Sequence, residues 1–208
     1  MFTNEHGDTI DVGRVETTEQ HDAAMYIIPG DVVLELGARY GTVTYQIHKA
    51  LKGLGAIVAV EPDSSVWSVL QSNLQNNGCM ERNDPTRPVI IPGVISRIPQ
   101  TLVGEGYGAK TVPGAGVHTT IDDVYAKYGI QPFTVIVADC EGCLGTVLLE
   151  NSALLKTARL VLFEADGTRC ENAHVRTLLR NAGFKDKTCV STRPLWDYVF
   201  NFHSVWVK

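Results

Sequence analysis

The chain has 208 residues, with 18 lysines and arginines against 23 aspartates and glutamates, and a formal net charge of −5 at pH 7. This length predicts one domain over residues 1–208, opening with a polar segment at 1–20. The sequence shows no basic stripe and no apolar run near the roughly 20 residues that cross a bilayer. We therefore expect a soluble, cytoplasmic protein that has neither nucleic acid nor membrane as a partner.

Short apolar runs alternate with amphipathic stretches along most of the chain, the pattern of a parallel sheet covered by helices on both faces. In chain order, the expected strands are 31–34, 56–60, 89–91, 133–138 and 160–164. The expected helices are 43–51, a segment capped by Asp63 or Ser64 that ends near 77–78, 120–128, a segment after Gly142, and 174–182. The runs 188–192 and 199–207 are joined by too few residues for a crossover helix, so we expect them to pair as an antiparallel hairpin.

A glycine-containing turn follows the first strand, at the junction where open α/β sheets bind a nucleotide-like cofactor. Glu61 ends the second strand, where such folds place a carboxylate against the ribose hydroxyls. Gly37 is expected to let the backbone approach this ligand closely. The residues predicted to contact the cofactor are Glu35, Gly37, Ala38, Arg39, Tyr40, Gly41, Glu61, Pro62, Ile95 and Asp139.

The residue types in this turn indicate which class of cofactor it binds. A dinucleotide turn normally reads G-x-G-x-x-G, whereas this one reads E-x-G-x-x-x-G from Glu35 to Gly41. Carboxylates at the strand ends, including Glu61 and Asp139, would repel a pyrophosphate but attract the sulfonium and ammonium of S-adenosylmethionine. We predict S-adenosylmethionine as the cofactor and disfavour an NAD-dependent oxidoreductase. The alternative is that the glycine turn is an ordinary connection between a strand and a helix of an α/β fold and binds no cofactor.

Several motifs together resemble FkbM-type methyltransferases from about Val32 to about Phe202. The matching segments are the glycine turn, Val60-Glu61-Pro62-Asp63, 73–78, Thr120-Ile121-Asp122-Asp123-Val124, Asp139-Cys140-Glu141-Gly142, the strand ending in Glu164, and 178–184. The resemblance implies a Rossmann-like class I methyltransferase fold, α/β, with a mostly parallel seven-stranded sheet and a C-terminal antiparallel hairpin. It also implies methyl transfer to an oxygen, commonly on a sugar or another small hydroxylated metabolite, and we expect a sugar or glycan precursor as the acceptor. As a partner we expect a glycosyltransferase, either fused to the chain or associated with it.

The chain departs from the family pattern at two positions. Val137 stands where the family usually has lysine, and Leu144 stands where it usually has an acidic residue. These departures keep open the alternative of a non-catalytic module that binds the donor.

An alcohol acceptor must lose its proton, which requires a base or a metal that acidifies the hydroxyl. Asp139 is the first candidate, with a helix cap or a donor-binding carboxylate as its alternative role. Glu141, Glu164 and His174 are the further catalytic candidates, although His174 also fits a surface histidine. Asp139, Glu164 and Asp166 would together offer oxygen ligands to a divalent cation such as magnesium, unless these carboxylates form a solvated rim.

Residues 97–118 are rich in glycine and too long for a simple connection, so we predict an acceptor-binding loop. The five cysteines are an odd number in a chain large enough to build its own core, which favours reduced thiols. Cys140 and Cys143 nevertheless form a C-x-x-C motif, for which a redox pair is the alternative.

Overall fold

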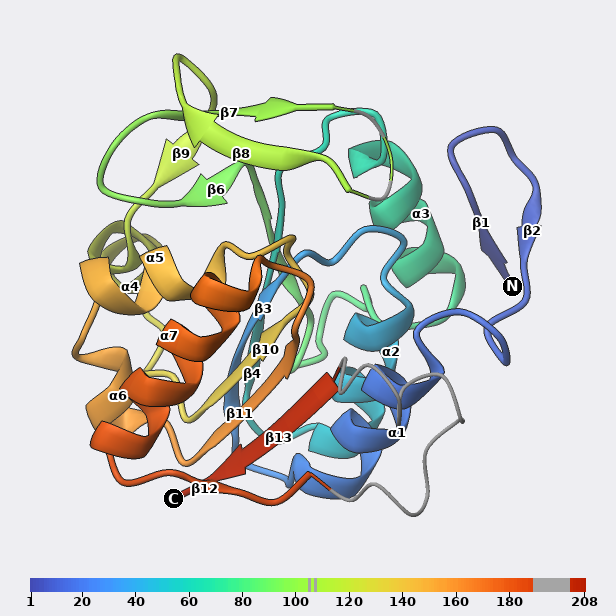
Figure 1. The fold of residues 1–208 in the computed structure, drawn as a ribbon. Coiled ribbons are helices and arrows are strands. Elements are labelled where there is room, and N and C mark those ends of the chain that lie inside the picture. The colour runs from blue at the N-terminus through green and yellow to red at the C-terminus, as the bar shows by residue number, and fades with distance from the viewer. Residues whose placement is uncertain (105, 107, 189–202) are drawn as a thin grey trace.

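A computed structural model describes residues 1–104, 106, 108–188 and 203–208. Its central strands are β3 (Val32–Leu36), β4 (Ala56–Glu61), β5 (Val89–Pro92), β10 (Val135–Ala138), β11 (Leu160–Glu164), β12 (Lys185–Asp186) and β13 (His203–Val207). They form one seven-stranded sheet in the order β12-β13-β11-β10-β3-β4-β5 (Figure 1). Adjacent strands within the run β11-β10-β3-β4-β5 are parallel to each other, and β13 is antiparallel to both β11 and β12. The predicted α/β fold with a mostly parallel sheet and a closing antiparallel hairpin is confirmed.

Helices cover both faces of this sheet (Figure 1). They are α1 (Thr17–Tyr26), α2 (Thr42–Leu51), α3 (Trp67–Asn76), α4 (Ile121–Tyr128), α5 (Leu144–Glu150), α6 (Leu154–Thr157) and α7 (Arg169–Asn181). Side chains from α4 to α7 pack on one face, which includes Leu34 and Leu36 of β3. Side chains from α1 and α2 pack on the other face, which includes Val33. Because side chains alternate along a strand, Glu35 belongs to the α1–α2 face.

Most predicted helices are present, with two differences at their starts. Helix α3 begins at Trp67 without a side-chain cap, because Asp63 instead accepts hydrogen bonds from the backbone and hydroxyl of Ser65. Helix α7 begins at Arg169 rather than at 174, because Thr168 and Glu171 form a capping box at this earlier start. Helix α4 also begins with a capping box, which Thr120 and Asp123 form.

Two segments hold structure that the apolar pattern did not predict. The polar N-terminus forms a short antiparallel pair, β1 (Phe2–Thr3) and β2 (Thr9–Ile10), followed by α1. The segment predicted as a loop contains the antiparallel pair β7 (Gln100–Val103) and β8 (Lys110–Pro113). It is flanked by the parallel pair β6 (Val94–Ile95) and β9 (His118–Thr119). These four strands lie together above one end of the central sheet (Figure 1).

The second strand of the hairpin predicted at the C-terminus is present as β13, and it pairs antiparallel with β12, which lies just before the predicted first run at 188–192. The part of the prediction that covers 189–202 lies outside the described residues. Across the residues that the structure describes, no helix combines the length and the apolar character needed to span a membrane.

Candidate active site

A cavity opens at the carboxyl ends of β3, β4 and β10, and the β7–β8 hairpin forms its opposite wall. Its wall is lined by Leu36, Gly37, Arg39, Val60, Glu61, Pro62, Asp63, Gly93, Val94, Ile95, Gln100, Leu102, Gly106, Ala109, Lys110, Thr111, Asp139, Cys140, Glu141, Gly142, Cys143, Thr146, Val147 and Glu171. The carboxyl ends of parallel strands are where open α/β sheets bind their ligands. The cavity is therefore the candidate active site.

Most of the residues predicted to contact a cofactor line this cavity, namely Gly37, Arg39, Glu61, Pro62, Ile95 and Asp139. Glu35, Ala38, Tyr40 and Gly41 lie outside its wall among the described residues. Gly41 has a φ of 81° and directly precedes α2, and a Cβ atom on it would come 2.9 Å from a methyl of Leu70. The second glycine of the turn therefore serves the packing of α2 against α3.

Gly37 is required by the backbone beside it. Its φ is 87°, and a Cβ atom there would lie 1.7 Å from the carbonyl oxygen of Asp139. The sequence predicts that this glycine gives the cofactor space and allows a positive φ, so that Gly37→Val would abolish donor binding and leave the fold largely intact. The geometry shows that any side chain at Gly37 would first collide with the end of β10.

Glu61 is the most buried carboxylate in the cavity wall, with 4% of its surface exposed. One of its carboxylate oxygens accepts a hydrogen bond from the backbone N–H of Arg39 and the other from that of Asp63, both at 2.7 Å. Burial raises the pKa of Glu61, and these two N–H groups oppose that shift. A carboxylate has about four lone-pair sites, so Glu61 retains acceptor capacity for hydroxyl groups in the cavity.

Glu35 lies in the core instead, as its position on the α1–α2 face of β3 requires. It is 2% exposed, and its Oε2 accepts a hydrogen bond from the hydroxyl of Thr44 at 2.7 Å. Its Oε1 is buried without a hydrogen-bond partner among the described residues. Burial raises the pKa of Glu35 to about 8, and the charges of Glu16, Glu61 and Asp139 add to the effect.

This burial predicts that stability falls as pH rises. Between pH 4.5 and about 8 the folded protein keeps the Glu35 proton that the unfolded chain releases, so the free energy of unfolding decreases across this window. The limit for one group is about 1.4 kcal/mol per pH unit. Because Glu16 and Asp166 also have raised pKa values, Glu35→Gln should make the slope shallower without abolishing it. Urea unfolding at several pH values measures how the free energy of unfolding depends on pH, and Glu81→Gln, at an exposed position, is the control. The prediction is contradicted if the free energy of unfolding falls with pH equally steeply in Glu35→Gln and in Glu81→Gln.

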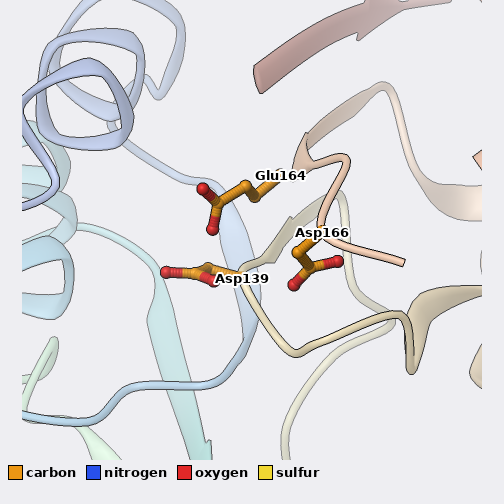
Figure 2. A group of neighbouring side chains, drawn as sticks. All are labelled: Asp139, Glu164 and Asp166. Carbon is orange, nitrogen blue, oxygen red and sulfur yellow. The ribbon is translucent and has the colours of Figure 1, made fainter. Parts of the chain in front are cut away.

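Asp139, Glu164 and Asp166 converge at the ends of β10 and β11, as Figure 2 shows. One carboxylate oxygen from each lies within 4.8 Å of the other two. Burial, a hydrogen bond with Asp139 and the charge of Asp139 raise the pKa of Glu164 to about 11. Because like charges this close cannot both ionise at low cost, Asp139 and Glu164 need either a shared proton or a cation between them.

Asp166 organises the loop that follows β10. Its carboxylate accepts hydrogen bonds from the backbone N–H groups of Cys140, Glu141 and Gly142, the first at 3.1 Å and the last at 2.9 Å. Burial and the charge of Asp139 raise the pKa of Asp166 to about 6. Asp166 therefore has a structural role in addition to its place beside Asp139 and Glu164.

Of the other two catalytic candidates, Glu141 lines the cavity and His174 does not. Glu141 lines the cavity and accepts a hydrogen bond from the backbone N–H of Gly108 at 2.6 Å. His174 is exposed on α7, with its Cδ2 near the position that a Cβ atom on Gly145 would take. The sequence did not single out the hairpin residues Gln100, Lys110 and Thr111. It predicted an acceptor-binding loop at 97–118, but no motif within that segment marks individual residues.

The cysteines differ from the prediction of reduced thiols. Cys140 and Cys143 are joined by a disulfide, and both line the cavity. Cys79 and Cys170 are free. The turn between the two bonded cysteines brings their Cα atoms to 5.5 Å, which is within the usual range for a disulfide.

No protein-family model matches the chain, and no curated protein matches its sequence. Its fold is similar to solved methyltransferase structures. Precorrin-6y C5,15-methyltransferase from Geobacter metallireducens GS-15 is 10% identical with a TM-score of 0.56, over 90% of this chain and 80% of that one. Aeropyrum pernix fibrillarin, solved with natively bound S-adenosyl-L-methionine, is 14% identical with a TM-score of 0.55, over 95% and 75%.

A methyltransferase FkbM from Methylobacillus flagellatus KT is 16% identical with a TM-score of 0.59. The match covers 86% of this chain and 44% of that one, so the chain spans less than half of that protein. At these identities the likeness concerns the fold, and it confirms the Rossmann-like arrangement typical of class I methyltransferases.

Proposed function

We propose that the chain is an S-adenosylmethionine-dependent O-methyltransferase. The observation that carries the proposal is the position of Glu61 and Asp139. Glu61 ends β4 and Asp139 follows β10, the two strands on either side of β3, and both residues line one cavity. The donor supplies a methyl group on a positively charged sulfur. Glu61 would accept hydrogen bonds from its ribose hydroxyls, and the apolar side chains of Pro62, Val94 and Ile95 would contact its base.

The charges around Asp139 support a cationic ligand. The Asp139 carboxylate is among the causes that raise the pKa values of Glu16, Glu35, Glu164 and Asp166. A positive charge beside Asp139 would relieve this repulsion, since opposite charges favour ionised carboxylates. A pyrophosphate in the same place would increase the repulsion, so these carboxylates support S-adenosylmethionine over NAD.

Transfer to a hydroxyl requires that the acceptor lose a proton, and Asp139 is the residue we propose to receive it. The same residues would fit a divalent cation, because Asp139, Glu164 and Asp166 offer the oxygen ligands that magnesium prefers. Asp166 already accepts three backbone hydrogen bonds, which leaves it limited capacity as a ligand. A cation would supply charge to acidify the acceptor hydroxyl; without one, Glu164 keeps its proton.

We further propose a sugar or glycan precursor as the acceptor. Gln100, Lys110 and Thr111 on the hairpin and Thr146 on α5 give the cavity polar groups beyond Asp139. Such groups suit an acceptor with several hydroxyls. Association with glycosyltransferases, which make such acceptors, belongs to the same proposal. Release of S-adenosylhomocysteine with candidate sugars tests it; donor binding without product across a broad set of acceptors would instead indicate a non-catalytic donor-binding module.

The donor site is tested most directly at Glu61. Charge-assisted hydrogen bonds are worth roughly 1.5–3 kcal/mol each, so Glu61→Ala should raise the Kd for S-adenosylmethionine by at least about tenfold. Calorimetry measures the Kd, and Glu81→Ala removes the same charge from an exposed position as a control.

A second ligand separates ribose recognition from a structural effect, since Glu61 also holds two backbone N–H groups. The 2′-deoxy analogue of S-adenosylhomocysteine should bind the wild type more weakly than the parent compound does. In Glu61→Ala this difference should disappear. If the variant distinguishes the two ligands as well as the wild type does, Glu61 does not bind the ribose.

A further inference from the structure

The disulfide between Cys140 and Cys143 lies in the wall of the cavity itself. Both cysteines are half-buried and both face the space in which the donor would bind. They stand between the end of β10 and the start of α5, directly after Asp139. A small thiol that enters the cavity can therefore reach the disulfide without unfolding the core.

The disulfide closes a turn whose conformation is unusual. Glu141 has a φ of 54°, a left-handed conformation that residues with a side chain rarely adopt, and Gly142 follows at 87°. Asp166 accepts the backbone N–H groups of Cys140, Glu141 and Gly142 on one side of this turn. The bond between the two sulfurs joins its ends and limits the conformations that Glu141 can reach.

The same turn anchors the opposite wall of the cavity. The Glu141 carboxylate accepts the backbone N–H of Gly108 at 2.6 Å, and Gly108 belongs to the connection between β7 and β8. This hydrogen bond links the loop after β10 to the hairpin across the cavity. The position of the hairpin therefore depends on the conformation of Glu141, which the disulfide constrains.

We propose that Cys140 and Cys143 form a reversible thiol–disulfide exchange site that sets how tightly the cavity binds the methyl donor. The inference rests on the proposed function for the identity of that donor. A thiolate of a small dithiol attacks one sulfur of the pair, forms a mixed disulfide and breaks the bond between the cysteines. The second thiol of the reductant then attacks the reductant's own sulfur in the mixed disulfide and releases the cysteine bound there. Two electrons and two protons have then reached the protein, and the reductant leaves as a cyclic disulfide.

The oxidised form is the one prepared for binding. With the disulfide closed, Glu141 stays in its left-handed conformation and holds the hairpin against the cavity. In the reduced form Glu141 can leave this conformation, so the wall must be ordered when the ligand binds. Because preorganised sites avoid that cost, reduction should raise the Kd for S-adenosylhomocysteine by about fivefold to tenfold.

The experiment compares the oxidised and dithiothreitol-reduced wild type, with the redox state of each checked by alkylation and mass spectrometry. Calorimetry gives the Kd for S-adenosylhomocysteine, and hydrogen exchange of 100–103 and 110–113 reports the hairpin. We expect weaker binding and faster exchange after reduction. Equal Kd values in the two forms would overturn the inference, as would a wild type whose cysteines remain reduced under an oxidant.

Two double variants assign the effect to this pair. In Cys140→Ser/Cys143→Ser, hydrogen exchange of the hairpin should match that of the reduced wild type and should not change when dithiothreitol is added. In Cys170→Ser/Cys189→Ser, dithiothreitol should change the exchange and the Kd as much as it does in the wild type. If the second variant alone loses the response, other thiols carry it and the inference fails. If S-adenosylhomocysteine binds neither form, the proposed function fails, but the hydrogen exchange of the hairpin still decides whether the disulfide controls this wall.

Discussion

Asp139→Asn should lower the turnover of the methyl transfer by about 10²–10⁴-fold, the usual contribution of a general base. The variant keeps the shape of the side chain but removes the charge that accepts the acceptor proton. The Kd for S-adenosylmethionine should change much less than turnover, because Glu61 and the glycine turn remain. Single-turnover kinetics and calorimetry measure the two effects separately.

Glu164→Gln is the matched variant for Asp139→Asn. If Asp139 and Glu164 share a proton, Glu164 is neutral near pH 7, since its pKa is raised to about 11, and glutamine reproduces that neutral form. Turnover should then survive in Glu164→Gln. If a cation lies between the two residues instead, both variants should lose turnover, and EDTA should inactivate the wild type until magnesium is added back.

A different result would move Asp139 to the donor site. If Asp139→Asn loses donor binding and turnover in equal measure, its carboxylate binds the donor rather than the acceptor. The base would then have to be sought at Glu141, Glu164 or His174. Of these, Glu141 lines the cavity, and Glu164 lies beside Asp139.

The sequence predicted the part of the site that depends on strand order. Glu61 and Asp139 each follow an apolar run, and parallel strands bring their carboxyl ends to one edge of a sheet, so the two residues had to meet there. The convergence of Asp139, Glu164 and Asp166 follows from the same rule. These are consequences of local pattern and topology, both of which one sequence can show.

Features that depend on the face of a strand or on contacts distant in sequence were harder to predict. Glu35 belongs to the same turn motif as Gly37, yet alternation along β3 directs its side chain into the core beside Thr44. The hairpin over the cavity is short and half-exposed, so its strands carry no clear apolar alternation. The fit of Gly37 against Asp139 joins residues about a hundred positions apart and leaves no local signal beyond a glycine.

Gly37→Ala should destabilise the fold as well as weaken donor binding. Its Cβ atom would lie 1.7 Å from the carbonyl oxygen of Asp139, so β3 and β10 would have to move apart. Overpacking of this kind costs about 1–3 kcal/mol, and a side chain in the left-handed region adds about 1–2 kcal/mol. Urea unfolding measures the loss of stability, and calorimetry with S-adenosylhomocysteine measures binding in the fraction that remains folded.

Gly30→Ala is the control that separates these two costs. Gly30 has a similar φ of 95°, but nothing lies within 4 Å of the Cβ atom that the substitution would add. This variant should lose only the roughly 1–2 kcal/mol of the backbone term and keep its donor affinity. The difference between the two variants then reports the collision with Asp139. If Gly37→Ala proves no less stable than Gly30→Ala, the turn and the end of β10 are not in contact as described, and the cavity wall at Asp139 must be arranged differently.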